Sequence, residues 1–316
     1  MIMNERIVYS VVLPVYNEAG TIPILWKRLS AALAELDGPA EVLFVNDASE
    51  DESRSLLEAI VHNNARVRLI SLSRNFGHQA ALTAGIDHAQ GEAVVLMDAD
   101  LQDEPESIAS FASKWREGYH VVYAVRRQRK ENLIKRLLFS VFYRASRCFS
   151  NVSLPMDAGI FSLMDHRVVD VLRKMPERNR YISGLRGYAG FRQVGIPIER
   201  GSRFEGRPRV TLVKLFKLAF DAIFSFSTVP LRLATFVGLL TATGSLAIGV
   251  TGLYYKYILH QEFLSWPYGL TTAFFFGGLQ LFFLGIIGEY IGRIYDEVKQ
   301  RPYYIVGDKA GFDEFE

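Results

Sequence analysis

Two long stretches without a charged side chain constrain this chain more than any other feature of its sequence. Residues 233–255 and 263–288 form runs of 23 and 26 residues that contain no Asp, Glu, Lys or Arg. A membrane-spanning helix needs about 20 mostly apolar residues, and both runs exceed the usual length of a buried helix. Because only a short link separates them, the sequence predicts a transmembrane hairpin, with spans at 229–258 and 264–292.

The placement of basic residues predicts the orientation of this hairpin. The link between the runs offers only Lys256, offset by Glu262. Basic residues cluster before the first span and after the second, at Arg203, Arg207, Arg209, Lys214, Lys217, Arg232, Arg293, Lys299 and Arg301. Lys and Arg are enriched in cytoplasmic loops, so we expect both chain ends, including a tail at 293–316, in the cytoplasm. The inner (plasma) membrane is the expected location.

The start of the chain and its cysteine content agree with a cytoplasmic N-terminal domain. The first apolar run stops at Pro14 without the small-residue cleavage pattern of a signal peptide. The single cysteine, Cys148, excludes an intramolecular disulfide and fits a reducing compartment. The formal net charge of +2 does not indicate a nucleic-acid partner.

Residues 1–210 have the pattern of an α/β domain. Short β-rich runs at 7–13, 41–45, 67–72, 93–97 and 121–125 alternate with helical patterns at 21–36, 52–62, 78–89 and 105–116. This alternation predicts a mostly parallel, Rossmann-like sheet with helices on both faces. In such sheets ligands bind at the carboxyl ends of the strands.

Two further segments have an amphipathic pattern. Residues at about 131–150 combine an apolar stripe with Arg136, Arg144 and Arg147, and 211–228 carry a narrow polar strip on an apolar helix. Such helices pack on a protein core or lie in the membrane interface. The spans that follow favour the interface.

Acidic residues follow several of the expected strands. Asp98 and Asp100 come directly after the run at 93–97, and Asn46 and Asp47 follow the run at 41–45. Carboxylates spaced in this way can share one Mg²⁺ or Mn²⁺ ion with substrate phosphates. Since Tyr16 and Glu18 follow another strand, we expect one pocket at this sheet edge. We expect His78 and His88, which lack partners at metal-ligand spacing, to be structural.

Several motifs, in order along residues 7–300, resemble a known enzyme family. They are Val12-Leu13-Pro14-Val15-Tyr16-Asn17-Glu18, Val45-Asn46-Asp47-Ala48-Ser49, Ser73-Arg74-Asn75-Phe76-Gly77 and Asp98-Ala99-Asp100-Leu101-Gln102-Asp103. Later markers are Phe142-Tyr143-Arg144, Met156-Asp157-Ala158-Gly159, Arg200-Gly201-Ser202-Arg203, Ser225-Phe226-Ser227 and Pro230-Leu231-Arg232. The chain is similar to the inverting family 2 glycosyltransferases of GT-A fold. Within them it resembles the polyprenyl-phosphate enzymes of the dolichol-phosphate mannose synthase-like branch, close to bacterial undecaprenyl-phosphate glucosyltransferases. It departs from the family pattern at Asn46 and Ala124.

The resemblance implies a role for each matching residue. The nucleotide donor would be bound by Pro14, Tyr16, Glu18, Asp47, Asp98 and Gln102. The metal would be held by Asp98, Asp100 and Gln102, and phosphates would be gripped by Arg126, Arg129, Arg200 and Arg203. Asp100 and Asp157 would be catalytic, with Asp157 acting as a general base or as an orienting group.

The expected reaction is transfer of a hexose from a nucleotide-sugar to a polyprenyl phosphate, with inversion. The best candidates are UDP-glucose and undecaprenyl phosphate, and GDP-mannose, UDP-N-acetylglucosamine and a UDP-aminoarabinose derivative remain alternatives. A processive polysaccharide synthase is disfavoured because the Q-x-x-R-W motif is missing. A non-catalytic membrane scaffold would have no need of clustered acids. Because enzymes of the family that the chain resembles are often oligomeric, we expect this chain to form a homo-oligomer.

Overall fold

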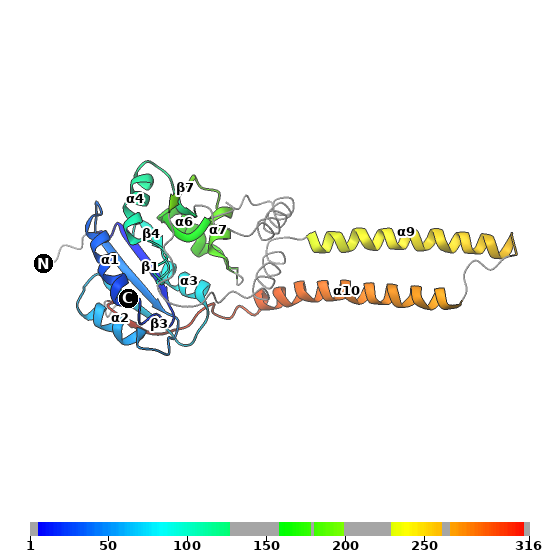
Figure 1. Cartoon of the computed structure of the whole chain (residues 1–316), viewed down its shortest axis with the longest axis horizontal. Coiled ribbons are helices and arrows are strands. Elements are labelled where there is room, and N and C mark those ends of the chain that lie inside the picture. Colours follow the sequence, from blue (N-terminus) through cyan, green and yellow to red (C-terminus); the bar gives the residue numbers. More distant parts are fainter. Residues whose placement is uncertain (1–5, 127–157, 178–179, 199–228, 261–265, 313–316) are drawn as a thin grey trace. The chain divides into compact units, whose positions relative to one another are not determined.

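The computed structural model describes residues 6–126, 158–177, 180–198, 229–260 and 266–312. The chain divides into two compact units (Figure 1). One contains the N-terminal part of the chain together with Arg301–Glu316, and the other contains Val210–Gln300. The expected amphipathic helices at 131–150 and 211–228 lie outside the described residues.

The first unit is built on an eight-stranded mixed sheet in the order β7-β5-β6-β4-β1-β2-β3-β8. Its strands are β1 (Tyr9–Val15), β2 (Ala40–Asn46), β3 (Val67–Leu72), β4 (Ala93–Leu96), β5 (Val121–Arg126), β6 (Ala158–Asp165), β7 (Gln193–Ile198) and β8 (Val306–Ala310). The central strands β4, β1, β2 and β3 are parallel, whereas β6 and β8 run antiparallel to their neighbours β4 and β3. This architecture confirms the expected α/β fold.

Helices cover both faces of this sheet, as the sequence predicted. One face packs against α1 (Ile22–Ala34), α2 (Ser53–His62) and α4 (Ile108–Arg116), which follows the short 3₁₀ turn η1 (Pro105–Ser107). The other face packs against α3 (His78–His88), α6 (His166–Lys174) and α7 (Ile182–Tyr188). Since both faces are covered, the central strands are buried throughout and read as almost continuous apolar runs.

Helix α3 lies unusually close to strand β1, and one glycine makes this possible. A Cβ atom added at Gly85 would lie only 2.1 Å from Cγ1 of Val12. Any side chain at this position would therefore push α3 away from the sheet. The close packing fixes the helix over the central strands and hence fixes its first residue, His78, at the carboxyl edge.

The end of the chain differs from the tail expected at 293–316. Helix α10 continues to Val298, and Val306–Ala310 then pairs with β3 as the edge strand β8. Arg54 of α2 forms an ion pair of 2.7 Å with Asp308, and the Tyr304 hydroxyl donates to Asp87 of α3 at 2.9 Å. The C-terminal residues are therefore part of the sheet unit.

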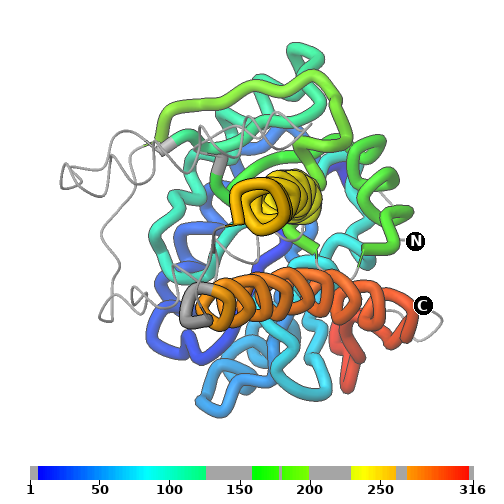
Figure 2. Tube along the Cα trace, turned by 90° about the vertical axis from the view of Figure 1, so that its right-hand side faces the viewer, coloured from blue at the N-terminus to red at the C-terminus, as the bar shows by residue number. Residues whose placement is uncertain are grey.

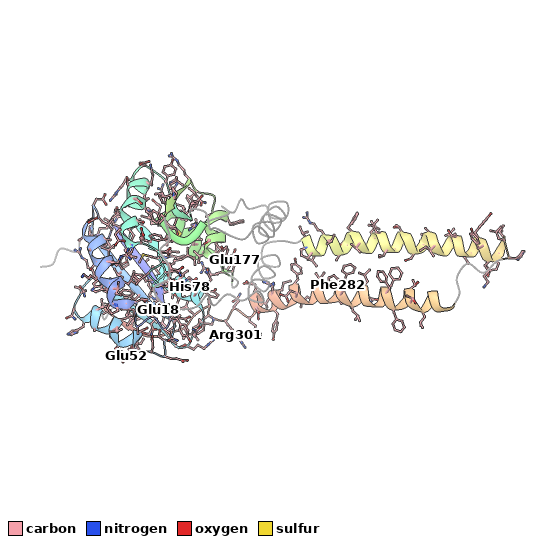
Figure 3. The ribbon with its side chains drawn as sticks, in the orientation of Figure 1. Glu18, Glu52, His78, Glu177, Phe282 and Arg301 are labelled. Atoms are coloured by element: carbon pink, nitrogen blue, oxygen red, sulfur yellow. The ribbon has the colours of Figure 1, made fainter. Side chains whose placement is uncertain are left out.

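The second unit contains two long apolar helices, α9 (Val229–Tyr257) and α10 (Trp266–Val298). They contact one another. Figure 1 shows them running alongside each other, and Figure 2 looks nearly along α9, with α10 inclined to it. Each is long and apolar enough to cross a membrane, and the most apolar 18-residue stretches have a mean hydropathy of 1.8 and 1.9. Their large apolar side chains are exposed, including Phe282 at 63% (Figure 3).

Candidate active site

The carboxyl ends of the central parallel strands lie at one edge of the sheet, and the polar segments singled out in the sequence follow them directly. Strand β1 pairs in parallel with β2 on one side and β4 on the other. This edge therefore carries Pro14, which is buried in β1, and, beyond the strand ends, Tyr16, Glu18, Asp47, Asp98, Asp100 and Gln102. The expectation that these segments share one edge agrees with this topology.

The loops after β1 and β2 are tied together by reciprocal hydrogen bonds. The Asn17 amide donates to Ser49 Oγ at 3.0 Å, and the Glu50 amide donates back to Asn17 Oδ1 at 2.8 Å. Asp51 accepts from the Ala19 amide at 3.1 Å and from the first amide of α2 at 3.0 Å. Asp51 therefore binds the first amide of α2 and joins the loops after β1 and β2.

Glu18, expected in the donor pocket, takes part in the entry to helix α1. Its amide donates to Ser53 Oγ at 2.9 Å, and its carboxylate accepts from the Thr21 hydroxyl at 3.2 Å. The Thr21 hydroxyl also donates to the Glu18 carbonyl at 3.0 Å. The structure thus gives Glu18 a local structural role at the same edge where a donor role is expected.

Asp47 is buried, with only 3% of its surface exposed. Its Oδ1 accepts from the Phe76 amide at 2.7 Å and its Oδ2 accepts from the Gly77 amide at 2.9 Å. Burial raises the pKa of Asp47, and the two amide hydrogen bonds only partly oppose that shift. Both carboxylate oxygens therefore hold the turn that leads into α3.

His78, which the sequence led us to expect as a structural residue, contacts the acidic cluster. Its Nε2 lies 2.9 Å from Oδ1 of Asp98. Partial burial acts to lower the pKa of His78, but the hydrogen bond to Asp98 and the nearby carboxylates outweigh it, so the pKa is raised. Since His78 begins α3 just beyond β3, its position after a strand end was the signal that could have identified it.

Asp98 and Asp100 follow β4 on a tight turn. Leu101, the next residue, has a φ of 60°, and the Gln102 amide donates to Asp100 Oδ1 at 3.1 Å. Both carboxylates keep part of their surface exposed. Within the described residues, no group of three His, Cys, Asp or Glu side chains is arranged to hold a metal ion. Two accessible carboxylates nevertheless fit Mg²⁺ or Mn²⁺, which take few protein ligands and complete their shell with phosphates and water.

The other expected site residues are less completely described. The backbone of Arg126 ends β5 and pairs with Ile198 of β7. Asp157, Arg129, Arg200 and Arg203 lie outside the described residues. Their roles in phosphate binding and catalysis stay predictions from the sequence.

A buried cation that the sequence analysis did not single out lies near the start of β6. Arg186 of α7 is 1% exposed, and its guanidinium lies over the Tyr123 ring and 3.4 Å from the Gly159 carbonyl. Burial lowers the pKa of Arg186 to about 10. The carbonyl that it faces belongs to Gly159, which is two residues from Asp157 in sequence.

Comparison with known proteins gives a consistent result along the whole chain. Residues 10–173 match the model of glycosyl transferase family 2. The chain is 42% identical to the uncharacterized glycosyltransferase YkcC of Bacillus subtilis, covering 98% of this chain and 97% of that protein. It is 36% identical to the prophage bactoprenol glucosyl transferase homolog of Escherichia coli, covering 94% and 97%.

Solved structures resemble this chain more distantly. Glucosyl-3-phosphoglycerate synthase from Mycobacterium tuberculosis, solved with Mn²⁺, UDP and phosphoglyceric acid, has a TM-score of 0.48 and 18% identity over 69% of this chain and 76% of that one. The family match and the relatives that cover nearly the entire chain are decisive. The chain belongs to glycosyl transferase family 2, and it is a glycosyltransferase.

Proposed function

We propose that this glycosyltransferase moves a hexose from a nucleotide-sugar to a polyprenyl phosphate, with UDP-glucose and undecaprenyl phosphate as the best candidates. The observation that carries the proposal is one chain that combines accessible acids at the carboxyl edge of the sheet with two long apolar helices. The first would serve a charged donor, and the second would hold the enzyme at a lipid acceptor. The name of the Escherichia coli relative, a bactoprenol glucosyl transferase homolog, supports both parts.

The donor site would use Asp98, Asp100 and Gln102 to hold a divalent cation and the donor diphosphate. When bound, Mg²⁺ or Mn²⁺ would neutralise negative charge on the leaving diphosphate. Tyr16, which is 37% exposed just beyond β1, is accessible to the nucleotide base or ribose. Since both oxygens of Asp47 hold backbone amides, we assign Asp47 to shaping the pocket rather than to direct contact with the donor.

The acceptor phosphate would need orientation more than activation. The second pKa of a phosphomonoester is about 6, so the nucleophilic oxygen is already ionised at neutral pH. Arg126, Arg129, Arg200 and Arg203 are the candidates to bind phosphates, because a guanidinium can donate two parallel hydrogen bonds to them. Asp157 would act as a base for the remaining monoanion or as an orienting group. In-line attack would invert the anomeric centre and give a β-linked lipid sugar from an α-linked donor.

The membrane arrangement completes the proposal. Helices α9 and α10 would form a transmembrane hairpin, with the sheet unit and both chain ends in the cytoplasm, as the basic residues that flank the spans favour. A homo-oligomer would cover part of their exposed apolar surface. The amphipathic segments at 131–150 and 211–228 would lie in the interface and bring the site to the lipid phosphate.

A donor screen tests this proposal directly. The purified full-length protein is mixed with undecaprenyl phosphate and radiolabelled UDP-glucose, GDP-mannose, UDP-N-acetylglucosamine or a UDP-aminoarabinose derivative, with Mg²⁺ or with EDTA. We expect label in the chloroform extract from UDP-glucose, and only with the metal. A product formed equally in EDTA would remove the metal from the proposal. The absence of lipid-linked product from every donor would overturn the acceptor assignment.

A further inference from the structure

We infer that His78 is a positioning residue for the metal-binding carboxylate of Asp98, and that Asp47 acts on the same carboxylate through the turn before α3. The inference rests on the proposed metal role of Asp98 and extends it to two residues that would not contact the metal themselves. It follows from three consecutive contacts that join the ends of β2, β3 and β4.

The first contact fixes the turn. Asp47 follows β2 and accepts hydrogen bonds from both Phe76 and Gly77, at 2.7 and 2.9 Å. Gly77 has a φ of 96°, a conformation that side chains disfavour, and it lies immediately before α3. A buried carboxylate that binds two successive amides holds such a turn in one geometry, because breaking either bond would leave a buried charge less well solvated.

The second contact is the packing of α3 itself. Residues Ala80–Ile86 of the helix are buried against the sheet, and Gly85 allows the close approach to Val12 of β1. At the same end of the helix, Gln79 Oε1 accepts from the Ile182 amide of α7 at 3.0 Å. The backbone that carries His78 is therefore held by the turn before it and by the helix after it.

The third contact is the hydrogen bond between His78 and the carboxylate of Asp98. His78 Nε2 lies 2.9 Å from Asp98 Oδ1, so the imidazole donates to one oxygen of the carboxylate. Figure 3 shows His78 within the sheet unit. A hydrogen bond to one carboxylate oxygen selects the orientation of the other, and loss of such outer partners typically weakens a metal site about 10–100-fold. His78 would thus orient Asp98 before the metal and donor arrive.

The test is a comparison of Mn²⁺ affinity among full-length variants, measured from the electron paramagnetic resonance signal of the free ion in the presence of UDP and, in parallel, GDP. We expect H78A to weaken Mn²⁺ binding about 10–100-fold. H78Q should restore most of the affinity, because its amide nitrogen can donate from nearly the same place as Nε2. His62, exposed at the end of α2, provides the matched control H62A, which should bind Mn²⁺ like the wild type.

A double-mutant cycle tests the Asp47 step. If Asp47 acts through His78, D47N combined with H78A should weaken Mn²⁺ binding little more than the stronger single change, because both remove the same interaction. Circular dichroism and thermal denaturation check that each variant is folded. Additive losses would overturn the step through the turn, and wild-type affinity in folded H78A would overturn the whole inference. If the wild type itself binds no Mn²⁺ with either nucleotide, the proposed metal role fails, and the inference fails with it.

Discussion

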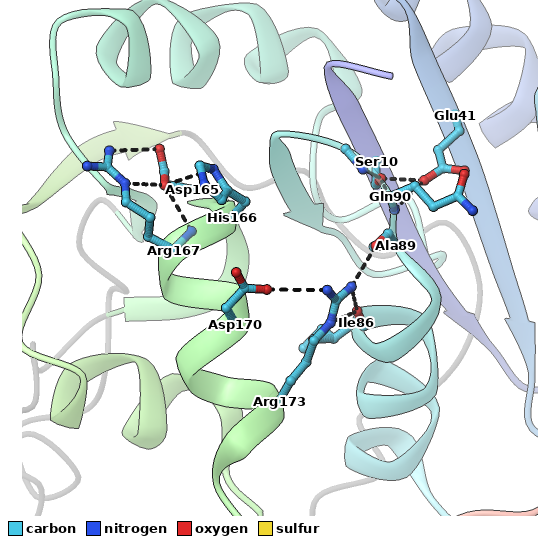
Figure 4. A network of polar contacts seen from close by, with 11 residues as sticks. Ser10, Glu41, Ile86, Ala89, Gln90, Asp165, His166, Arg167, Asp170 and Arg173 are labelled. Atoms are coloured by element: carbon cyan, nitrogen blue, oxygen red, sulfur yellow. Dashed lines mark hydrogen bonds and ion pairs between the residues drawn. The ribbon is translucent and has the colours of Figure 1, made fainter. Parts of the chain in front are cut away.

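A buried acid lies at each end of strand β2, Glu41 within the strand and Asp47 one residue beyond it, and each accepts hydrogen bonds that hold a turn. Near the amino end, Glu41 is 1% exposed and accepts from the Ser10 hydroxyl and from the Gln90 amide (Figure 4). Just past the carboxyl end, Asp47 is 3% exposed and accepts from two amides. Glu41 therefore holds the turn before β4, and Asp47 holds the turn before α3.

The difference lies in what surrounds each acid. Glu41 faces the Arg68 guanidinium at 3.4 Å, and the turn it holds leads into β4. The turn held by Asp47 leads to His78 and from there to the accessible Asp98. The amino edge thus stabilises the fold, whereas the carboxyl edge holds accessible acids in a fixed geometry. We therefore expect substitutions at the carboxyl edge to lower activity and substitutions at the amino edge to lower stability.

The largest expected effect is a large loss of activity with little loss of stability at the carboxyl edge. D98A should lower lipid-linked sugar formation at least about 10³-fold, because it removes a proposed ligand of the cation that would neutralise the leaving group. Its denaturation midpoint should fall only slightly, because the contact with His78 that it removes is a single hydrogen bond. Asp170, exposed on α6, gives the control D170A, which should keep full activity. Activity near the wild-type level in folded D98A would refute the metal assignment.

The second prediction concerns Glu41 at the amino edge, where a substitution should lower stability and leave activity unchanged. E41Q keeps the acceptor for Ser10 and Gln90 but removes the buried charge that faces Arg68, which should lower the free energy of unfolding by about 3 kcal/mol. At temperatures where the variant is folded, kcat and KM should be unchanged. Denaturant titration and transfer assays on the same preparation check both parts. A stable variant with impaired transfer would reverse the roles assigned to the two edges.

Much of the fold could be predicted because its central part repeats one local pattern. The runs at 67–72 and 93–97 coincide with β3 and β4 to within one residue, since strands covered on both faces read as apolar runs. Strand β8 could not be recognised in this way. Residues Gly307, Asp308 and Lys309 have little intrinsic strand preference, and they pair with β3 only because tertiary contacts bring the chain end back to the sheet.

In the site too, the sequence predicts which strand ends carry the acids but not which side chains contact them. Strand ends located the acids at one edge, because that follows from topology alone. Spacing in the sequence gives His78 no partner, whereas its contact with Asp98 spans 20 residues and depends on how closely α3 packs on β1. The sequence does not indicate the burial of Arg186 either, since an arginine on a short helix is usually exposed.

The third prediction concerns the pH dependence of stability, which involves Asp165 at the amino edge. Asp165, at the end of β6, pairs in register with Ala93 at the start of β4. Burial acts to raise its pKa, but hydrogen bonds from Arg167 and Trp115 lower it from 3.8 to about 2. Figure 4 shows the contact with Arg167. A lowered pKa means that Asp165 stabilises the fold above pH 3.8, and that this stability is lost as the pH falls toward 2.

Because Arg167 is largely exposed and its charge is screened, we expect Asp165 to contribute about 1–2 kcal/mol rather than the full value of the shift. Denaturation midpoints measured at intervals from neutral pH down to about pH 2 should therefore fall more steeply in the wild type than in D165N. Equal slopes would show that other carboxylates dominate the acid transition.

The smallest effect concerns backbone strain. Glycine occupies the left-handed positions before β5, β7 and α3, at Gly118, Gly190 and Gly77. The loops after β1, β2 and β4 instead place Asn17, Ala48 and Leu101 at φ values of 54°, 55° and 60°. An alanine in this conformation costs about 1 kcal/mol of strain, which glycine avoids. Glycine also has more conformational freedom in the unfolded chain, which offsets part of this gain in stability. A48G should therefore raise the free energy of unfolding by about 0.5 kcal/mol. Three loops at the carboxyl edge thus place a non-glycine residue in a conformation that favours glycine. If A48G is less stable than the wild type by denaturant titration, the strain at this edge is offset by contacts of the Ala48 side chain.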